Sequence, residues 1–385
     1  MKRIGIYMER QRAWGRRVCE GIASFAQTHN DWMLEFVEHE QLTNRERLLA
    51  FDGFIARIPD KRTAQAFSRT GKPVADMTCE VYSKSSIFRG VRQDNAAIGQ
   101  MAAQHFIEHR FANFAFCGYN NTRFSKERQD GFVRSLNQSP SLCPVYTISY
   151  DIDNRTRLSE HLDNKGRNAA KLCGWLRDLP KPCAIFCAND TLAYRVFMGC
   201  RAAGLSIPTD IALLGVDNDT LICNFMTPTL SSIDPDAFGL GIAAAELLDK
   251  HISDSAANEE PSRIAPRELI VRGSSQTFPV NPSWLSDALI FIHQNVHRHL
   301  SAADVHAHLK LSHTRVDTVF RNRLGTTIQK EIRRTSLSEA ERMLRLTDIP
   351  VAEIAKRTGF ASPQYFCNSF TAYYGLSPSA WRERG

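Results

Sequence analysis

The sequence predicts an α/β fold of two lobes with parallel sheets, followed by an all-α domain. Three observations predict it. Residues 3–272 alternate short apolar runs with amphipathic segments, the strand pattern ends before residue 284, and one helical pattern occurs twice in the last part of the chain. A chain of 385 residues has room for two or three domains of ordinary size, which agrees with this division.

Eight apolar, β-branched runs predict strands. They are Arg3–Met8, Met33–Val37, Gly53–Ile58, Pro73–Met77, Phe114–Gly118, Val145–Tyr150, Ala184–Ala188 and Ile211–Val216. Amphipathic segments between them predict helices, for example at Arg16–Gln27, Ala96–His109, Lys126–Leu136, Asn168–Leu176 and Thr191–Ala203. This alternation indicates right-handed βαβ units with helices on both faces of parallel sheets. Because such a stretch is long for one sheet, we expect two lobes, with a ligand cleft at the carboxyl ends of the strands.

A linker is predicted at residues 273–283, where two prolines, a glycine and polar residues show no helical period. It separates a domain at 1–272 from a helical domain at 284–385. Residues 281–385 contain 14 Lys and Arg against 9 Asp and Glu, so +5 of the formal charge of +7 lies there. An almost neutral large part joined to a basic small part favours a sensor or an enzyme followed by a domain that binds a polyanion.

One helix-turn-helix pattern occurs twice in the helical domain, first at residues 301–325. Ser301 and Asp304 predict a capping box, and Ser312 is expected to cap the second helix, which begins three or four residues after the first one ends. Val316 and Phe320 then fall on one face of the second helix, which we expect to pack inward.

The second copy spans residues 350–375. Gly359 supplies the turn, Ser362 the cap, and Pro363 the first helical position, where its missing N–H does no harm. Phe366 and Phe370 stand at the same offsets from the cap as Val316 and Phe320, so this helix also has one inward face and one face free to enter a groove.

This duplicated pattern resembles the DNA-binding domain of the AraC family of transcription regulators. The resemblance covers about residues 284–383 and includes the ending Gly375-Leu-Ser-Pro-Ser-Ala-Trp-Arg382. It implies that the stretch 327–345 is a linking helix that holds two reading helices at adjacent major-groove faces, about 34 Å apart. The positions expected to face the groove are His313, Thr314, Asp317, Thr318 and Arg321 in the first copy and Pro363, Gln364, Tyr365, Cys367 and Asn368 in the second.

The first 272 residues resemble the sugar-sensing part of LacI/GalR-type repressors and the related periplasmic binding proteins. The residues that carry this resemblance are Ile185-Phe-Cys-Ala-Asn-Asp-Thr-Leu-Ala193, Gly204-Leu-Ser-Ile-Pro-Thr-Asp-Ile-Ala-Leu-Leu-Gly-Val-Asp-Asn218, Asp94-Asn95 and Glu127-Arg-Gln-Asp-Gly-Phe132. LacI-type repressors begin with their own helix-turn-helix, whereas here the first predicted strand starts at residue 3 and the DNA reader is expected at the other end.

A sugar offers hydroxyls that donate and accept and C–H faces that pack on aromatic rings. The resemblance implies polar contacts from Asp94, Arg128, Asp190 and Asp217, with Asn189 and Asn218 as further candidates, and Trp14 and Arg16 follow the first strand in a loop where that family contacts ligand. Each position also has a structural alternative: Asp190 could cap a helix, Asp217 could cap a turn and Trp14 could belong to the core.

The combined resemblance is to AraC-family regulators of xylose operons. It implies a sugar-responsive regulator, an activator of a pentose operon, in which closure of the cleft controls binding to double-stranded promoter DNA. The implied partners are D-xylose or another monosaccharide, RNA polymerase and a second copy of the chain in a homodimer. The alternatives are a sugar-processing α/β enzyme with an accessory helical domain and an adaptor that binds only protein. No nucleotide-binding or hydrolase motif favours the enzyme.

Neither a membrane span nor a signal peptide is predicted, and the ten scattered cysteines fit reduced core thiols. We therefore expect a cytoplasmic protein without membrane contact. No cofactor motif occurs, and we expect no metal site. His293 and His297 have a spacing that a metal would accept, but no second ligand motif accompanies them.

Overall fold

The computed structural model describes residues 1–29, 31–78, 87–136, 143–148, 167–253 and 262–384. These divide into two compact units, Met1–Ser275 and Gln276–Gly385. The expected linker at 273–283 spans this division. Ser274 is buried in the first unit, where its Oγ donates to the carbonyl of Leu213 at 2.6 Å, and Phe278 is buried in a core of the second.

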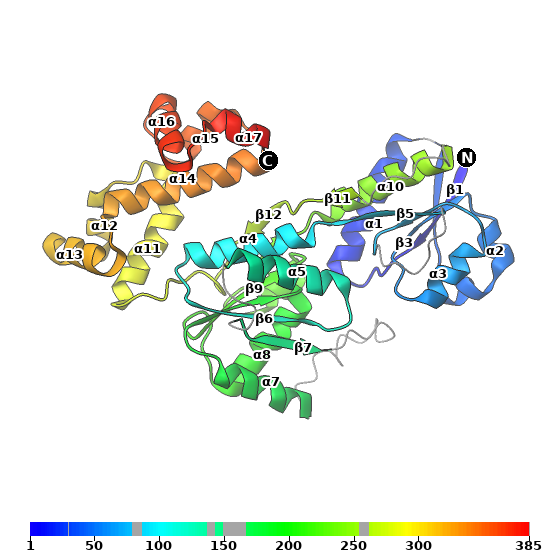
Figure 1. Cartoon of the computed structure of the whole chain (residues 1–385), viewed down its shortest axis with the longest axis horizontal. Coiled ribbons are helices and arrows are strands. Elements are labelled where there is room, and N and C mark those ends of the chain that lie inside the picture. The colour runs from blue at the N-terminus through cyan, green and yellow to red at the C-terminus, as the bar shows by residue number, and fades with distance from the viewer. Residues whose placement is uncertain (30, 79–86, 137–142, 149–166, 254–261, 385) are drawn as a thin grey trace. The chain divides into compact units, whose positions relative to one another are not determined.

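The first lobe of the first unit contains a six-stranded sheet (Figure 1). In spatial order its strands are β11 (Ser262–Ile264), β5 (Phe88–Gln93), β4 (Val74–Asp76), β3 (Gly53–Ala56), β1 (Lys2–Tyr7) and β2 (Trp32–Phe36), all paired in parallel. Its helices are α1 (Ala13–Thr28), α2 (Arg45–Leu49), α3 (Lys61–Ser68) and α10 (Ala237–Ser253), with a 3₁₀ turn at His39–Thr43. Helices α1 and α10 pack together and share one apolar core with β1, β3 and β5.

The second lobe has a matching sheet. Its strands in spatial order are β12 (Glu268–Ile270), β10 (Ser231–Asp234), β9 (Ile211–Val216), β8 (Cys183–Cys187), β6 (Asn113–Tyr119) and β7 (Val145–Ile148). Only β12 runs antiparallel to its neighbour. Within the described residues, the helices of this lobe are α4 (Asn95–Glu108), α5 (Arg123–Ser135), α7 (Arg167–Asp178), α8 (Asp190–Ala203) and α9 (Thr220–Phe225).

The chain crosses between the lobes three times, from β5 to α4, from β10 to α10 and from β11 to β12. The crossing segments are hydrogen-bonded to one another. The amide of Asp94 donates to the carbonyl of Ile264 at 2.7 Å, and the amide of Arg267 donates to the carbonyl of Asp234 at 2.9 Å. Strands β11 and β12, which come late in the sequence, therefore each form an edge strand of one lobe. The two lobes are joined by three adjacent connections.

The second unit consists of helices on two small cores. The first core joins α11 (Ser283–Asn295), α12 (Ala302–Leu309) and α13 (His313–Leu324), and the second joins α15 (Val351–Arg357), α16 (Pro363–Tyr374) and α17 (Pro378–Arg384). Helix α14 (Ile328–Leu346) contributes Ile328 and Ile332 to the first core and Leu337 and Leu344 to the second. One continuous helix therefore ties the two copies of the pattern together, as the sequence predicted.

All eight predicted strands are present within a few residues of their expected bounds, although Tyr150 lies outside the described residues. The five helices named as examples also form. Strands β5, β10, β11 and β12 were not predicted. Strand β5 carries buried Arg89, Arg92 and Gln93, and β10 begins with buried Ser231 and Ser232, so neither has an apolar run. In the part of the chain that the structure describes, no helix combines the length and the apolar character needed to cross a bilayer.

Candidate functional site

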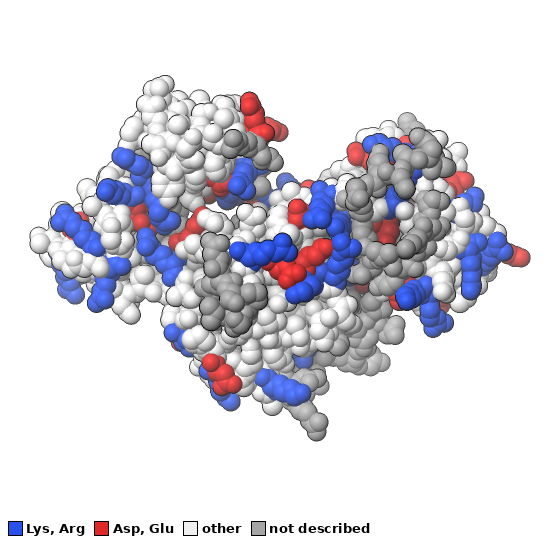
Figure 2. All heavy atoms as spheres, viewed as in Figure 1, with Lys and Arg blue, Asp and Glu red and all other residues white. Residues whose placement is uncertain are grey.

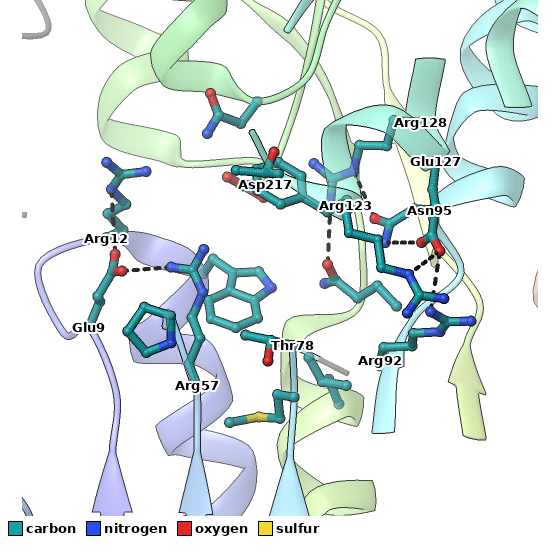
Figure 3. A pocket seen from close by; sticks show the side chains of 18 of the residues that line it. Glu9, Arg12, Arg57, Thr78, Arg92, Asn95, Arg123, Glu127, Arg128 and Asp217 are labelled. Carbon is teal, nitrogen blue, oxygen red and sulfur yellow. Dashed lines mark hydrogen bonds and ion pairs between the residues drawn. The ribbon is translucent and has the colours of Figure 1, made fainter. Parts of the chain in front are cut away.

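A cavity of about 210 Å³ lies at the carboxyl ends of strands from both lobes (Figure 3). Glu9, Arg57 and Thr78 line it just beyond β1, β3 and β4 of the first lobe, and Asn121, Asn189 and Asp217 line it just beyond β6, β8 and β9 of the second. The cleft expected from the strand pattern is thus a cavity lined by both lobes, and most of the residues that line it are polar or charged.

In the first lobe, Glu9 is shared by two arginines. Its carboxylate accepts from Arg57 Nη1 at 2.7 Å and lies 3.9 Å from Arg12 Nε, and only 8% of its side chain is exposed. The Arg57 guanidinium lies 5.3 Å from the centroid of the Trp14 ring, which is close enough for a cation–π contact. This group therefore places two guanidiniums and an aromatic face beside the cavity.

Glu127 of the second lobe is shared in the same way. Its carboxylate accepts from Arg123 Nε at 2.8 Å, from Arg92 Nη1 at 3.2 Å and from Asn95 Nδ2 at 3.2 Å. Burial acts to raise the pKa of Glu127, but the hydrogen bonds from Arg123 and Asn95 and the charge of Arg92 outweigh it and lower that pKa. Glu127 is thus a carboxylate at neutral pH.

Arg128 lies behind these side chains and is only 3% exposed. It donates from Nε to Asn95 Oδ1 at 2.9 Å, from Nη1 to the carbonyl of Ala188 at 2.5 Å and from Nη2 to Gln93 Oε1 at 3.3 Å. Burial lowers the pKa of Arg128, and the negative charges of Asp217 and Asp190 oppose that shift. The close approach of α4 and α5 holds this cluster in place, since a Cβ on Gly131 would lie 2.3 Å from the carbonyl oxygen of Ala96.

Asp217 enters the cavity from a strained turn. Its φ is +107°, in the region that favours glycine, and the next residue, Asn218, has a φ of +46°. Burial raises the pKa of Asp217 to about 6, while the positive charges of Arg128, Arg12 and Arg57 act to lower it. Arginines of both lobes are therefore close enough to this carboxylate to act on its charge.

Four of the eight ligand residues expected from the sequence line the cavity: Trp14, Arg128, Asn189 and Asp217. Asn189 is also the cap of α8, since its Oδ1 accepts from the amide of Leu192 at 3.0 Å. Capping of the helix was the alternative role for Asp190, but the residue that caps α8 is Asn189.

Among the described residues, the lining does not include the other four, Arg16, Asp94, Asp190 and Asn218. Arg16 is exposed and donates to the carbonyl of Gln11 at 2.7 Å, while Asp94 caps α4 by accepting from the amide of Ala97 at 3.0 Å. Asn218 accepts from Arg272 Nη2 at 2.8 Å.

Asp190 is fully enclosed in the second lobe. It accepts from Ser232 Oγ at 2.7 Å and from the amide of Asp219 at 2.8 Å, and burial raises its pKa well above the ordinary value. A Cβ on Gly215 would lie 2.1 Å from its Oδ1, so the glycine of the motif makes room for this carboxylate. Asp190 therefore ties β9, β10 and α9 together rather than facing the cavity.

Several lining residues were not predicted, although a general signal for them exists. Glu9, Arg57 and Asn121 follow strands directly, at the ends where ligands bind in sheets of this kind. Asn95 and Glu127 are next to Asp94 and Arg128, which were predicted as ligand residues from their motifs. Arg92 could not be found in this way, because its strand was itself not predicted.

In the second unit, α12 and α13 form the first helix-turn-helix pair. Ser301 and Asp304 make the predicted capping box, with the amide of Ser301 donating to Asp304 Oδ2 at 2.9 Å. Ser312 stands at the start of α13 but makes no capping hydrogen bond through its side chain, so that expectation was wrong. Val316 and Phe320 are fully buried, as predicted.

The expected groove-facing residues of α13 are exposed, except that Asp317 is half-buried. Asp317 Oδ1 lies 3.4 Å from Nε2 of His306, a buried residue of α12. The ring of His306 in turn stacks on the ring of His313 at 4.0 Å between centroids. His313 and Asp317 are thus held by the neighbouring helix, while Thr314, Thr318 and Arg321 face solvent.

The second pair, α15 and α16, repeats this geometry. Ser362 Oγ accepts from the amide of Tyr365 at 3.2 Å, and Phe366 and Phe370 are fully buried. The expected reading residues Pro363, Gln364, Tyr365 and Asn368 are exposed, whereas Cys367 is half-buried against the core.

Basic side chains are distributed unequally over the two reading helices. Exposed Arg315, Arg321 and Arg323 lie on α13, and α16 contains no Lys or Arg. On the face shown in Figure 2, blue atoms gather over α13 and α14, while α16 is mostly white. Arg333 of α14 partly compensates, because its guanidinium lies 5.4 Å from the centroid of the Tyr365 ring and donates to the Tyr365 hydroxyl.

Comparison with known proteins matches both units. A periplasmic binding protein-like domain matches residues 103–275, and a helix-turn-helix domain matches residues 306–384. The xylose operon regulatory protein of Haemophilus influenzae is 26% identical over 388 residues, which cover 99% of this chain and 98% of that protein. The chain is a transcription regulator that joins a periplasmic-binding-protein-like domain to an AraC-type helix-turn-helix domain.

Solved structures support the fold of the regulator. The structure of a xylose-binding transcription activator has a TM-score of 0.58 at 22% identity, covering 100% of this chain and 98% of the other. A LacI family regulator from Enterococcus faecium with bound ribose has a TM-score of 0.57 at 20% identity and covers 73% of this chain and 100% of its own. The expected two-lobed α/β fold with a helical DNA-binding domain is confirmed, and so is the expectation of a regulator rather than an enzyme.

Proposed function

We propose that this regulator binds a monosaccharide in the cavity between its lobes and thereby controls its binding to promoter DNA. One observation carries the proposal: a charged cavity of sugar size at the strand ends occurs in one chain with two exposed reading helices. The names of its relatives make D-xylose or another monosaccharide the effector to test first.

Trp14, Arg128, Asn189 and Asp217 contact the effector in this proposal, the first through its ring face and the others through hydrogen bonds. Arg16, Asp94, Asp190 and Asn218 instead make hydrogen bonds within the protein. An effector that touches both lobes favours the closed state through its greater affinity for that state. The three adjacent connections form the hinge.

On DNA, Thr314, Thr318 and Arg321 of α13 and Pro363, Gln364, Tyr365 and Asn368 of α16 meet base edges or phosphates, with His313, Asp317 and Cys367 supporting them. Gln and Asn make bidentate hydrogen bonds to adenine, and Arg contacts guanine or phosphate. We further propose that a cytoplasmic homodimer binds two sets of half-sites and recruits RNA polymerase as an activator of a pentose operon.

The test is a DNA-binding titration of the purified full chain on the promoter fragment beside its gene, with and without each sugar of a pentose and hexose panel. We expect one sugar to change the DNA affinity at least tenfold and to raise the melting temperature of the protein. Light scattering measures the mass of the complex, and transcription in vitro with purified RNA polymerase measures activation. A monomeric complex whose DNA affinity no sugar changes would contradict the proposal.

A further inference from the structure

A buried histidine lies directly behind the first reading helix. His306 of α12 is only 8% exposed, and its Nε2 lies 3.4 Å from Oδ1 of Asp317 on α13. The ring of His306 also stacks on the ring of His313, with 4.0 Å between the centroids and 14° between the planes. One buried side chain of α12 therefore meets two residues of α13 that stand about one helical turn apart.

The surroundings of His306 determine where its ring carries the hydrogen. Within the described residues, Nδ1 of His306 is buried and has no hydrogen-bond partner. A hydrogen on Nδ1 would be an unpaired buried donor, which is rare in proteins, so the neutral ring carries its hydrogen on Nε2. That hydrogen faces the carboxylate of Asp317. An apolar side chain would fill the buried position without leaving a polar atom unpaired, so packing alone does not explain a histidine there.

Asp317 combines this restraint with exposure. Its side chain is 44% exposed on the helix that also carries exposed Arg315 and Arg321, and the phosphates of DNA repel its charge. In the part of the chain that the structure describes, Asp317 lies within ion-pair distance of His306 and not of Arg321, although Arg321 follows one turn later. A carboxylate in the major groove accepts from the N4 amino group of cytosine. Asp317 is thus held on one side and accessible to a base on the other.

The second copy of the helix-turn-helix pattern lacks this arrangement. Fifty residues further along the chain, Lys356 takes the position of His306, and Cys367 takes that of Asp317. Lys356 is exposed rather than buried, and Cys367 offers no carboxylate. The two copies share their fold but not this pair of side chains, so the fold of the pattern does not require the pair.

We infer that His306 is a positioning residue for DNA reading, which holds Asp317 so that its exposed edge accepts from the N4 amino group of one cytosine. The stack with His313 fixes the orientation of the His306 ring. Asp317 thereby selects a base in addition to supporting its neighbours. This inference rests on the proposed function, because it requires α13 to lie in the major groove of the bound DNA.

The experiment begins with the sequences that the full chain selects from a randomised double-stranded DNA library, with and without each sugar of the pentose and hexose panel. Titrations against single-base variants of the best sequence then give the base preference at every position. We expect Asp317→Ala to reduce the preference for cytosine at one position at least fivefold. His306→Leu should reduce the preference at that same position by a similar factor and change the preferences elsewhere less than twofold.

Three further variants separate positioning from packing. Glutamine offers an N–H donor at about the reach of the histidine Nε2, so His306→Gln should keep the cytosine preference within twofold. His306→Phe keeps a ring without a donor and should act as His306→Leu does, which provides a second test should the leucine variant fail to fold in a urea titration. His308→Leu is the matched control, because His308 lies on the same helix but stacks on Phe291 of α11, and it should alter no preference.

Combining His306→Leu with Asp317→Ala should reduce the cytosine preference no further than Asp317→Ala alone, because His306 acts through Asp317. The inference fails, and the proposed DNA binding stands, if Asp317→Ala changes no base preference. It fails equally if His306→Leu and His306→Phe weaken all sequences by one factor, or if both keep the cytosine preference. If the full chain enriches no sequence under any condition, the proposed DNA-binding function fails together with the inference.

Discussion

The polar side chains of the sensor cavity and those of the reading helices differ in how the protein holds them. Arg128 is buried and donates to three protein acceptors, and Glu127 accepts from three donors. Gln364 and Asn368 of α16 are exposed, and the hydrogen bond between them is 3.4 Å long. A polar group of the cavity is therefore part of the fold, whereas a polar group of a reading helix is available to a partner.

This difference predicts separable effects of substitution. A change in the cavity removes protein–protein hydrogen bonds and alters the free energy of unfolding as well as effector binding. A change on the reading helices leaves that free energy nearly unchanged and alters DNA binding alone. Variants in the two regions therefore test whether these effects are separable.

Arg128→Ala should produce the largest effect. It leaves Asn95, Gln93 and the carbonyl of Ala188 without their donor and removes the positive charge that acts most strongly on Asp217. Breaking such a buried, paired group typically costs about 3–5 kcal/mol, so we expect a loss of that size in the free energy of unfolding, together with loss of effector binding. Urea titration of the full chain measures it.

The matched control is Arg177→Ala, since Arg177 is exposed on α7. We expect it to change the free energy of unfolding by less than about 0.5 kcal/mol. A loss below about 1 kcal/mol for Arg128→Ala would mean that the cavity tolerates substitution as the reading helices do, and the contrast between the two regions would disappear.

Asp217→Asn should change how the stability of the sensor depends on pH. Burial raises the pKa of Asp217 from 3.8 to about 6, so the folded protein binds this proton more tightly than the unfolded chain does. The stabilisation that this bound proton gives the folded protein is complete below about pH 4 and is lost as pH rises through 6. The shift of the pKa corresponds to roughly 3 kcal/mol.

The asparagine variant lacks that titration. The quantity to compare is the free energy of unfolding of the variant minus that of the wild type. This difference should be about 2–3 kcal/mol more positive at pH 7 than at pH 4, so the variant gains stability relative to the wild type as pH rises. Urea titrations of both proteins at four pH values between 4 and 7 measure the difference. Parallel pH curves for the two proteins would show that Asp217 has an ordinary pKa.

Gln364→Ala and Arg321→Ala should separate the two reading helices. Gln364 stands on α16, which has no basic residue, and Arg321 stands on the basic face of α13. We expect Gln364→Ala to relax discrimination at one base pair by about 1–3 kcal/mol. Arg321→Ala should instead weaken binding to all sequences and lower the salt slope by about one.

Titrations against single-base variants of the operator, at three salt concentrations, distinguish these outcomes. Neither variant should change the free energy of unfolding by more than about 0.5 kcal/mol. If Gln364→Ala weakened binding to every DNA sequence equally and lowered the salt slope, α16 would contact the DNA backbone as α13 does. The two reading helices would then differ in charge but not in role.

The sequence predicted the fold well where one local pattern decides the structure. Apolar runs identified eight strands, and the spacing of Ser301, Val316 and Phe320 identified a helix-turn-helix and its core. Strand β5 was not predicted, because its buried residues include Arg89 and Arg92. The burial of Arg92 depends on a partner from a distant segment, Glu127, which no local pattern reveals.

The same reason explains which cavity residues were found. Motif residues indicated the right strand ends, yet only the fold decides whether the side chain of Asn95 or of Asp94 faces the cavity. Asp190 shows the reverse case. Its motif is exact, but its carboxylate turns toward Ser232 and the amide of Asp219, because Gly215 leaves a space there. Side-chain direction at a strand end is a property of the packed structure.

Tyr365→Phe should have the smallest effect, and it tests whether α14 supports the second reading helix. The change keeps the ring beneath the Arg333 guanidinium and removes only the hydroxyl to which Arg333 donates. We expect no measurable change in the free energy of unfolding and a loss of about 0.5–1 kcal/mol in DNA binding, since one hydrogen bond that orients Arg333 is gone. Arg333→Ala alone and the double variant complete a double-mutant cycle. A coupling energy near zero would mean that Arg333 and Tyr365 act independently on DNA, and that the second reading helix, unlike the cavity, has no fixed support for its polar groups.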